Sequence, residues 1–184
     1  MKAVVFTFLL AAFIYQVKAQ EDNMIITDFT ESKKLEWFVI NDGVMGGLSE
    51  SSMTLTNEGK GKFSGSVSLE NNGGFASVRA VVPKTDYSDN EAITVKVKGD
   101  GQKYKFRIRN DRNFDGVSYQ ADFTAGDNWQ EITFTADDFI PVFRGRVVRD
   151  YPALDFGNMK QIGFLISDKQ TGKFELLIDS IWME

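Results

Sequence analysis

Apolar and polar residues alternate with a period of two along most of the chain, as expected for β-strands that bury one face. Phe63, Gly65, Val67 and Leu69 share one side of such a segment, and serine occupies each position between them. Residues 92–98 alternate in the same way. We therefore predict strands at both places, each with its apolar side toward the core.

A Gly-Asp-Gly turn at 99–101 joins residues 92–98 to a second alternating segment, 103–109. Glycine in a short connection between two such segments is typical of a β-hairpin. The sequence therefore predicts that these two segments pair with each other. The residues of the second segment expected to point inward are Tyr104, Phe106 and Ile108, and those expected to point outward are Lys103, Lys105, Arg107 and Arg109.

Similar segments, separated by turns rich in Gly, Asn and Asp, continue to the C-terminus. About ten or eleven short strands fit the pattern, and no segment has the period of an amphipathic helix of three turns. This pattern favours an all-β fold, either an antiparallel β-sandwich or a jelly roll.

The first residues have the composition of a secretory signal peptide. Lys2 provides a positive start, residues 3–15 are apolar, and Val17-Lys18-Ala19 is a small-x-small cleavage site. We predict a signal peptide at 1–19 and a single jelly-roll domain at 20–184. The protein is then expected to be exported, either periplasmic or extracellular. The apolar run is short for a membrane span, so no membrane insertion is expected after cleavage.

The amino-acid composition excludes several kinds of chemistry. Without His or Cys the chain has no Ser-His-Asp triad, no thiol nucleophile and no ordinary zinc site. No nucleophile motif, phosphate loop or dinucleotide fingerprint occurs either, so we predict no enzymatic activity and no catalytic residues. The formal net charge of −5 argues against a nucleic-acid partner. Sixteen Phe indicate that a large core holds the domain together without disulfides.

Several motifs together resemble one family, the thirty-kilodalton complex I intermediate-associated proteins. The most specific is the block at 41–49, Asn-Asp-Gly-Val-Met-Gly-Gly-Leu-Ser. The other motifs are Phe63-Ser64-Gly65, residues 73–79 with Arg79 at their end, Lys98-Gly99-Asp100-Gly101 with Tyr104, Tyr119-Gln120, Trp129 with Ile132, Phe143-Arg144-Gly145, Ile162-Gly163-Phe164 and Gly172-Lys173-Phe174. Arg79 and Tyr119 belong to these motifs and are therefore candidate ligand- or partner-binding residues.

The resemblance implies a galactose-binding-like jelly roll and a non-enzymatic role. Mitochondrial members of the family are assembly factors for respiratory complex I, and many carbohydrate-binding modules share the fold. The leading hypothesis is therefore a non-catalytic binding protein that acts through protein–protein contact. The alternative is an exported protein that resembles a carbohydrate-binding module. The oligomeric state stays open.

The block at 41–49 allows two interpretations. Three glycines give its backbone access to positive φ, and Asn41 and Asp42 can bond to nearby main chain in a turn. Asn41 and Asp42 could present their side chains to a ligand, or they could form a sandwich corner. For Met45 we expect burial between the sheets, because a single Met is more often core than contact.

Two groups of cations are candidate binding elements. Arg107 and Arg109 could hold a carboxylate or a sugar hydroxyl by forked hydrogen bonds. The interpretation we favour for their row is a solvated strand face, paired with acids such as Asp122 on the next strand. Arg144, close to two further arginines in an irregular region, could belong to a partner-binding loop or simply to a soluble one.

Two other candidates concern calcium and sugar. Asp111, Asn113 and Asp115 match the start of a calcium loop, but the flanking segments are predicted strands rather than the helices of an EF-hand, so a hairpin turn is the favoured interpretation. No other cofactor is expected. Large rings could form a sugar-stacking platform, although most rings in a sandwich belong to the core. The rings outside the clearest inward rows are Trp37, Tyr87, Tyr151 and Trp182, of which only Tyr151 is expected to be exposed.

Overall fold

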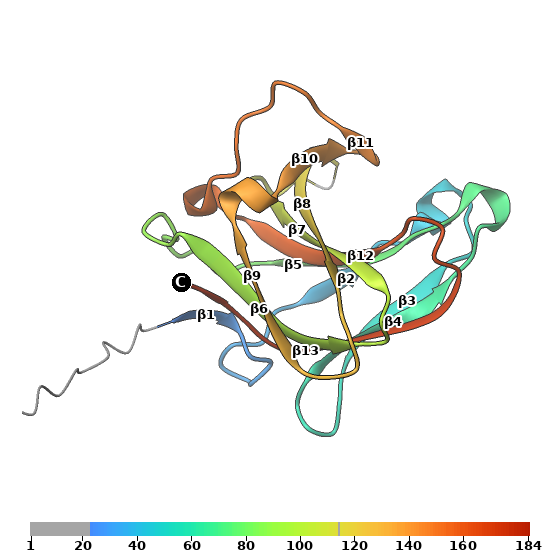
Figure 1. Cartoon of the computed structure of the whole chain (residues 1–184), viewed down its shortest axis with the longest axis horizontal. Coiled ribbons are helices and arrows are strands. Elements are labelled where there is room, and N and C mark those ends of the chain that lie inside the picture. Colours follow the sequence, from blue (N-terminus) through green and yellow to red (C-terminus); the bar gives the residue numbers. More distant parts are fainter. Residues whose placement is uncertain (1–22, 114) are drawn as a thin grey trace, which may run out of the picture.

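Two antiparallel β-sheets face each other across one apolar interior in the computed structural model, which describes residues 23–113 and 115–184 (Figure 1). One sheet has six strands: β1 (Met24–Thr27), β3 (Glu50–Leu55), β4 (Gly61–Val67), β6 (Ala92–Gly99), β9 (Gln130–Thr135) and β13 (Gly172–Met183). The other has seven: β2 (Trp37–Val39), β5 (Ala76–Val81), β7 (Lys103–Arg109), β8 (Ser118–Thr124), β10 (Ile140–Phe143), β11 (Arg146–Val147) and β12 (Gln161–Ile166). The all-β sandwich predicted from the alternating pattern is confirmed.

Four short 3-10 segments complete the regular structure of these residues: η1 (Asp42–Met45), η2 (Glu70–Asn72), η3 (Ala136–Asp138) and η4 (Phe156–Asn158). In the part of the chain that the structure describes, no helix has the length and apolar character of a membrane span. The predicted signal peptide at 1–19 lies outside the described residues.

The interior is built largely from aromatic rings on the inner faces of both sheets. Phe106 of β7 lies with its ring centroid 5.3 Å from that of Phe164 on β12 and 5.8 Å from that of Phe134 on the opposite sheet. Phe63 and Phe174 meet edge to face at 4.8 Å within the six-stranded sheet. Such contacts exclude water from both sheets at once, so one continuous core joins them.

The predicted hairpin of residues 92–98 with 103–109 is wrong. β6 pairs with β13 and β9, whereas β7 pairs with β8 and β12 in the other sheet. The turn at 99–101 crosses between the sheets, and Gly99 and Gly101 donate their N–H groups to the carbonyls of Gly126 and Ala125. Period-two alternation shows which side of a strand is buried but does not show which strand it pairs with. The inward positions of β7 are nevertheless as expected, because Tyr104, Phe106 and Ile108 are fully buried.

Candidate functional site

A row of six residues crosses the outer face of the seven-stranded sheet. Directly paired residues of adjacent strands share a face, so the register defines the row. From β10 through β8, β7, β12 and β5 to β2, the row reads Ile140, Gln120, Arg107, Gly163, Arg79 and Phe38. The two arginines are therefore separated by one strand, whose residue in the row has no side chain.

Gly163 is buried in the middle of this row, next to a void of about 20 Å³ that Arg79 and Arg107 also line. A Cβ atom at this position would lie 2.4 Å from the backbone oxygen of Val78, so a larger residue does not fit without a backbone shift. An isolated glycine inside a strand often marks a place where another group comes close to the backbone.

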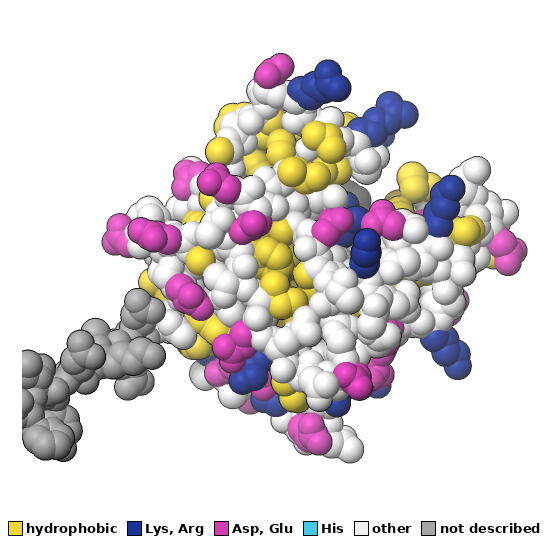
Figure 2. All heavy atoms as spheres, viewed as in Figure 1, with side chains coloured by type: hydrophobic (Ala, Val, Ile, Leu, Met, Phe, Trp, Pro, Cys, Tyr) yellow, Lys and Arg dark blue, Asp and Glu magenta, His cyan; other side chains and the backbone are white. Residues whose placement is uncertain are grey.

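A cavity of about 650 Å³ lies over the centre of this face. Its floor includes Arg79, Arg107 and Arg109, and we call it the arginine cavity. The other lining residues are Ile40, Val44, Met45, Phe75, Ser77, Lys105, Asp115, Gly116, Ser118, Gln120, Arg144, Gly145, Leu165, Ser167 and Asp168. Figure 2 shows hydrophobic side chains on the projection that carries β10 and β11 and on the projection at the right of the view, where η1 and η2 lie in Figure 1.

The three floor arginines repel one another in a partly desolvated place. Burial lowers the pKa of Arg107 to about 10, and the nearby charges of Arg109 and Arg79 contribute to that shift. Burial likewise lowers the pKa of Arg79 to about 10, with Arg109 adding to the shift. The pKa of Arg109 is also lowered by burial, while Asp111 and Asp115 oppose that shift. All three guanidinium groups stay charged at neutral pH, so the floor is a concentrated positive site.

The hydrogen bonds of two floor arginines go to neutral acceptors. Arg107 Nη2 donates to Gln120 Oε1 at 2.9 Å, and Arg109 Nη1 donates to the carbonyl of Gly116 at 3.0 Å. Arg107 Nε is buried and has no hydrogen-bond partner among the described residues. A buried N–H group of this kind is costly unless something accepts its hydrogen bond.

Lys105 differs from its arginine neighbours because acids neutralise it. Its Nζ lies 3.1 Å from Asp122 and 2.6 Å from Asp168. Lys105 and Arg109 are each only 8% exposed, so the favoured interpretation of a solvated row is wrong for both residues. The predicted pairing with Asp122 on the next strand is present. Neighbouring strands and the turn after β12 bury Lys105 and Arg109. The pattern of a single strand does not reveal such neighbours.

The rim of the cavity carries exposed apolar side chains. Val44 and Met45 of η1 line the cavity and are 67% and 63% exposed. The expected burial of Met45 is therefore wrong, because η1 turns outward beside the cavity instead of entering the core. Opposite η1, the exposed guanidinium of Arg144 bonds to Asp115 and holds the 143–146 turn against the loop after β7.

The side chains of Asn41 and Asp42 accept hydrogen bonds that hold the 41–49 block against neighbouring segments of the chain. The buried Asp42 carboxylate accepts from Ser49 N at 2.9 Å, from Gly74 N at 2.7 Å, from Phe75 N at 3.2 Å and from the Ser49 hydroxyl. Asn41 Oδ1 accepts from the Ser51 hydroxyl and from Ser77 N. Neither residue lines the arginine cavity. Of the two interpretations, the structure supports the corner.

The Asp42 carboxylate also accounts for a glycine in this block. A Cβ atom at Gly47 would lie 2.4 Å from that carboxylate, so the glycine leaves room for it. Burial by itself raises the pKa of Asp42, but the bonds from the Ser49 hydroxyl and from the three N–H groups outweigh burial and lower the pKa below its usual value.

Tyr119 and Tyr151 lie away from the arginine cavity. Tyr119, a predicted ligand- or partner-binding residue, faces inward, is 4% exposed and donates to the carbonyl of Pro152 at 2.9 Å. Tyr151 is 42% exposed, as expected, and its ring centroid lies 5.9 Å from that of Tyr119. Tyr87 and Trp182 are buried, and Trp37 packs against Phe164. These rings do not form a common sugar-stacking platform.

The predicted calcium residues occupy the loop between β7 and β8. Asp111 Oδ1 accepts from Asn113 N at 2.8 Å, and Asp115 is paired with Arg144. Among the described residues no group of three or more acidic side chains lies close enough to hold a metal ion. Calcium at Asp115 would have to compete with the guanidinium of Arg144, and calcium binding stays a prediction.

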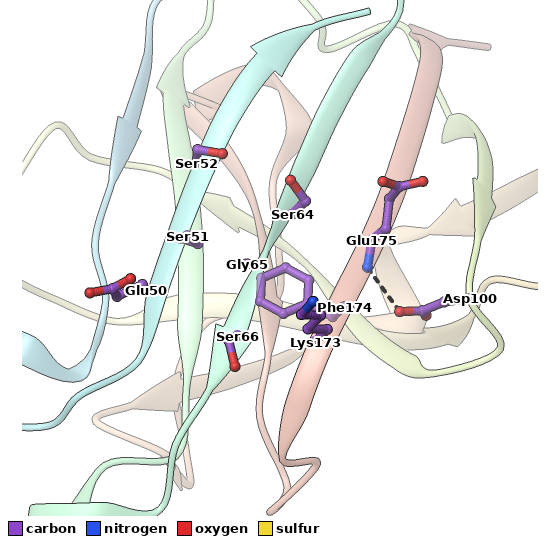
Figure 3. A pocket seen from close by; sticks show the side chains of 10 residues that line it. All are labelled: Glu50, Ser51, Ser52, Ser64, Gly65, Ser66, Asp100, Lys173, Phe174 and Glu175. Carbon is purple, nitrogen blue, oxygen red and sulfur yellow. Dashed lines mark hydrogen bonds between the residues drawn. The ribbon is translucent and has the colours of Figure 1, made fainter.

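A second hollow, of about 720 Å³, lies on the outer face of the six-stranded sheet (Figure 3). Serines of β3 and β4 line it together with side chains from the start of β13, and Asp100 accepts from Glu175 N across it at 2.8 Å. It is slightly larger than the arginine cavity, but its side chains hold no buried cluster of charge. We therefore place the candidate site at the arginine cavity.

The fold is a galactose-binding-like β-sandwich, and one of its faces carries a recessed, arginine-lined cavity. Residues 27–178 match the model of the family described as Complex I intermediate-associated protein 30 (CIA30). Because this match covers most of the chain, the protein belongs to the CIA30 family.

Curated relatives support this assignment. The chain is 27% identical to the mitochondrial complex I intermediate-associated protein 30 of Mus musculus, over 88% of this chain and 56% of the relative. It is 26% identical to the protein of the same name in Drosophila melanogaster, over 87% and 62%. An uncharacterized protein of Schizosaccharomyces pombe is 28% identical over 77% and 74%. The chain thus spans less than two thirds of the mouse and fly relatives.

These names overturn two related predictions. The mouse and fly relatives are named as mitochondrial proteins, which contradicts the predicted signal peptide and the predicted periplasmic or extracellular location. The leader pattern of a short apolar run after a lysine was the only basis for those predictions, and a leader carries no information about the folded domain.

Two carbohydrate-binding modules are among the solved structures with the same fold. A family 11 module from Clostridium thermocellum, in complex with a mixed-linked β-1,3-1,4 tetrasaccharide, superposes with a TM-score of 0.65 at 17% identity, covering 88% of this chain and 94% of the module. A family 29 module superposes with a TM-score of 0.53 at 7% identity, covering 88% and 87%. At such identities the likeness establishes the fold alone.

Sequence reasoning identified Arg79, Arg107, Arg109 and Arg144 but missed most of the cavity around them. The apolar rim was missed because an exposed Val or Met looks like a core residue in a sequence. One available signal was not used. Gly163 interrupts an otherwise apolar strand at an outward position, which indicates a close approach to the backbone.

Proposed function

We propose that this chain is a non-catalytic binding protein that acts through contact with a partner protein at the arginine cavity. The observation that carries the proposal is the combination of three charged guanidinium groups on the cavity floor with exposed Val44 and Met45 at its rim. Arginine surrounded by apolar side chains is a common composition for the energetically dominant part of a protein interface.

The acids of the cavity are poorly suited to catalysis. A general acid at neutral pH needs a raised pKa. Asp115 has a lowered pKa, chiefly because of the hydrogen bond from Arg144, and Asp168 has a lowered pKa, chiefly because of the bond from Lys105. Both carboxylates therefore stay ionised and paired. The sequence also contains no imidazole to act as a general base and no thiol to act as a nucleophile.

The names of the relatives suggest where such a partner belongs. The mouse and fly proteins are named for association with complex I intermediates and as mitochondrial. We propose that this chain has a similar assembly-factor role, with a protein of such an intermediate as its partner. The mouse and fly relatives contain further sequence that this chain does not span, and their whole activity need not reside in this domain.

Site-specific photocrosslinking tests this proposal. A photoreactive residue at Val44 lies on the rim of the arginine cavity, and one at the exposed Ser52 lies on the opposite sheet. In a mitochondrial extract that contains complex I intermediates, we expect crosslinks to complex I proteins from Val44 and none from Ser52. The same products from both positions, or no product from Val44, would remove the support for this face as the partner site.

Carbohydrate binding is the second candidate function, favoured by the fold shared with the family 11 module. Its test is thermal unfolding with the mixed-linked tetrasaccharide. A ligand at 100 times its dissociation constant adds about 2.7 kcal/mol to the free energy of unfolding, which raises Tm by a few degrees in a domain of this size. An unchanged Tm at high oligosaccharide concentration would argue against this function for the mixed-linked glucan class.

A further inference from the structure

The charge of the arginine cavity is opposite in sign to the net charge of the whole chain. The whole chain has a formal net charge of −5, yet the cavity is lined by five cationic and two acidic side chains. The two acids are engaged, Asp168 with Lys105 and Asp115 with Arg144. The bonds of Arg107 and Arg109 to neutral acceptors do not cancel their charges. The remaining positive charge is therefore concentrated on the floor.

The row across the sheet determines how the charges of Arg107 and Arg79 are arranged. Arg107 and Arg79 stand on either side of the buried Gly163, so no side chain of β12 separates them in the row. An oxygen anion in the arginine cavity faces the guanidinium groups of both residues on the floor. A carboxylate fits such a place because its two oxygens accept several hydrogen bonds from the planar fork of arginine.

The ends of the same row are apolar. Phe38 on β2 is 48% exposed, and Ile140 on β10 is 45% exposed. Six adjacent strands span about 24 Å at the usual strand spacing. An extended chain covers that distance in about seven residues. The row therefore has the length of a short peptide, with positive charge at its middle and apolar contacts at its ends.

Building on the function proposed above, we infer that the arginine cavity binds an extended acidic segment of the partner protein, about seven residues long. A central Glu or Asp enters the arginine cavity and faces Arg107 and Arg79 on its floor. Apolar side chains near each end of the segment lie outside the cavity and contact Phe38 and Ile140 at the ends of the row. Val44 and Met45 cover the segment from one side of the cavity. The flexible Met45 can adapt to different side chains.

A peptide suits this face better than a sugar. A sugar needs exposed rings on which to stack. The exposed rings of Phe38, Trp129, Phe143 and Tyr151 do not line the cavity, and the one described ring that does, Phe75, is half-buried. Aliphatic side chains beside buried guanidinium groups instead match a ligand that combines carboxylate with apolar side chains.

A competition between two peptide pools tests the inference. Both pools contain acetylated and amidated seven-residue peptides with leucine at each end, and they differ only in a central Glu or Gln. Equal amounts are passed over the immobilised protein, and the retained peptides are quantified by mass spectrometry. We expect the Glu pool to be enriched at least about tenfold, because only it forms charge-assisted hydrogen bonds with the arginines. The enrichment should fall at about 1 M salt.

Three variants locate the binding. We expect Arg107→Gln to abolish the preference for Glu, and Met45→Glu to weaken retention of the Glu pool at least about tenfold by placing a like charge at the cavity mouth. Met45 is exposed, so this second variant should fold even if the first does not. Arg112→Gln, an exposed cation outside the cavity, is the matched control and should behave as the unchanged protein.

Each outcome decides the matter. Equal retention of both pools, or a preference for Glu that survives both cavity variants, overturns the inference. Arginine-dependent binding of an oligogalacturonate probe, without enrichment of the Glu pool, assigns the site to acidic sugars instead. If neither probe binds while Val44 still crosslinks to complex I proteins, acidic recognition fails and the proposed function stands. If the crosslinks are absent as well, both fail.

Discussion

At the scale of single residues, Asp42 shows how one buried carboxylate can organise a glycine-rich block. It is fully buried and accepts four hydrogen bonds, from Ser49, Gly74 and Phe75. The bonds from Gly74 and Phe75 connect residues more than thirty positions apart in the sequence. The block therefore holds η1, and with it Val44 and Met45, in place beside the arginine cavity.

We expect Asp42→Asn to lower the free energy of unfolding by about 2 to 3 kcal/mol at neutral pH. The amide has the same shape, but it places N–H groups against the N–H donors that now bond to the carboxylate. Urea denaturation followed by circular dichroism measures the difference. Asp89→Asn, at an exposed aspartate, is the matched control and should change the stability little.

The effect of Asp42→Asn should depend on pH in one direction. The pKa of Asp42 is lowered in the folded protein, so the ionised group stabilises the fold above the unfolded pKa of about 3.9. That contribution is lost as the pH falls from this value through the folded pKa. The stability difference between the two proteins should therefore be constant near neutral pH and shrink below about pH 4. A difference that does not change down to strongly acidic pH would contradict the lowered pKa.

At the scale of elements, the β10–β11 hairpin depends on a contact outside its own strands. β10 pairs with β8, and β11 pairs only with β10 through Val142 and Phe143 among the described strands. The turn between them has positive φ at Arg144 and Gly145. The bond from Arg144 to Asp115 is thus an additional anchor for a hairpin whose turn lines the cavity.

We expect Arg144→Ala to speed amide exchange at residues 143–147 and to leave the core strands unchanged. The ion pair is exposed, and such pairs contribute little to global stability although they can order a loop. Hydrogen exchange with mass spectrometry measures the effect. Arg146→Ala, which removes an exposed cation from the same hairpin, is the control. Equal exchange in both variants would show that the Asp115 contact does not hold the turn.

At the scale of the whole molecule, both sheets share one interior, so neither is expected to unfold alone. Trp37 reports on the seven-stranded sheet, where its ring lies against Phe164, and the buried Trp182 reports on the six-stranded sheet. In variants that keep only one of these tryptophans, we expect denaturation midpoints by fluorescence to coincide with each other and with circular dichroism. Separate midpoints would show two cooperative units.

Several features of the fold were determined by the sequence itself. Alternation determined the inward side of β7, because a strand with apolar residues on one side can bury only that side. The absence of His and Cys limited the chemistry independently of the fold. The motifs at 41–49 and 73–79 identified the family, because they encode a specific arrangement around Asp42.

Only the tertiary structure decided which strands pair and which charges meet. The Gly-Asp-Gly sequence at 99–101 is typical of a hairpin turn, yet this turn crosses between the sheets because β6 pairs with β13 and β9. Arg79 and Arg107 come together because β12 lies between their strands with Gly163 in the row. Local periodicity depends on neighbours two residues apart, whereas a site depends on contacts between distant segments. For this protein the sequence determined the two-layered fold, and strand order determined the arginine cavity.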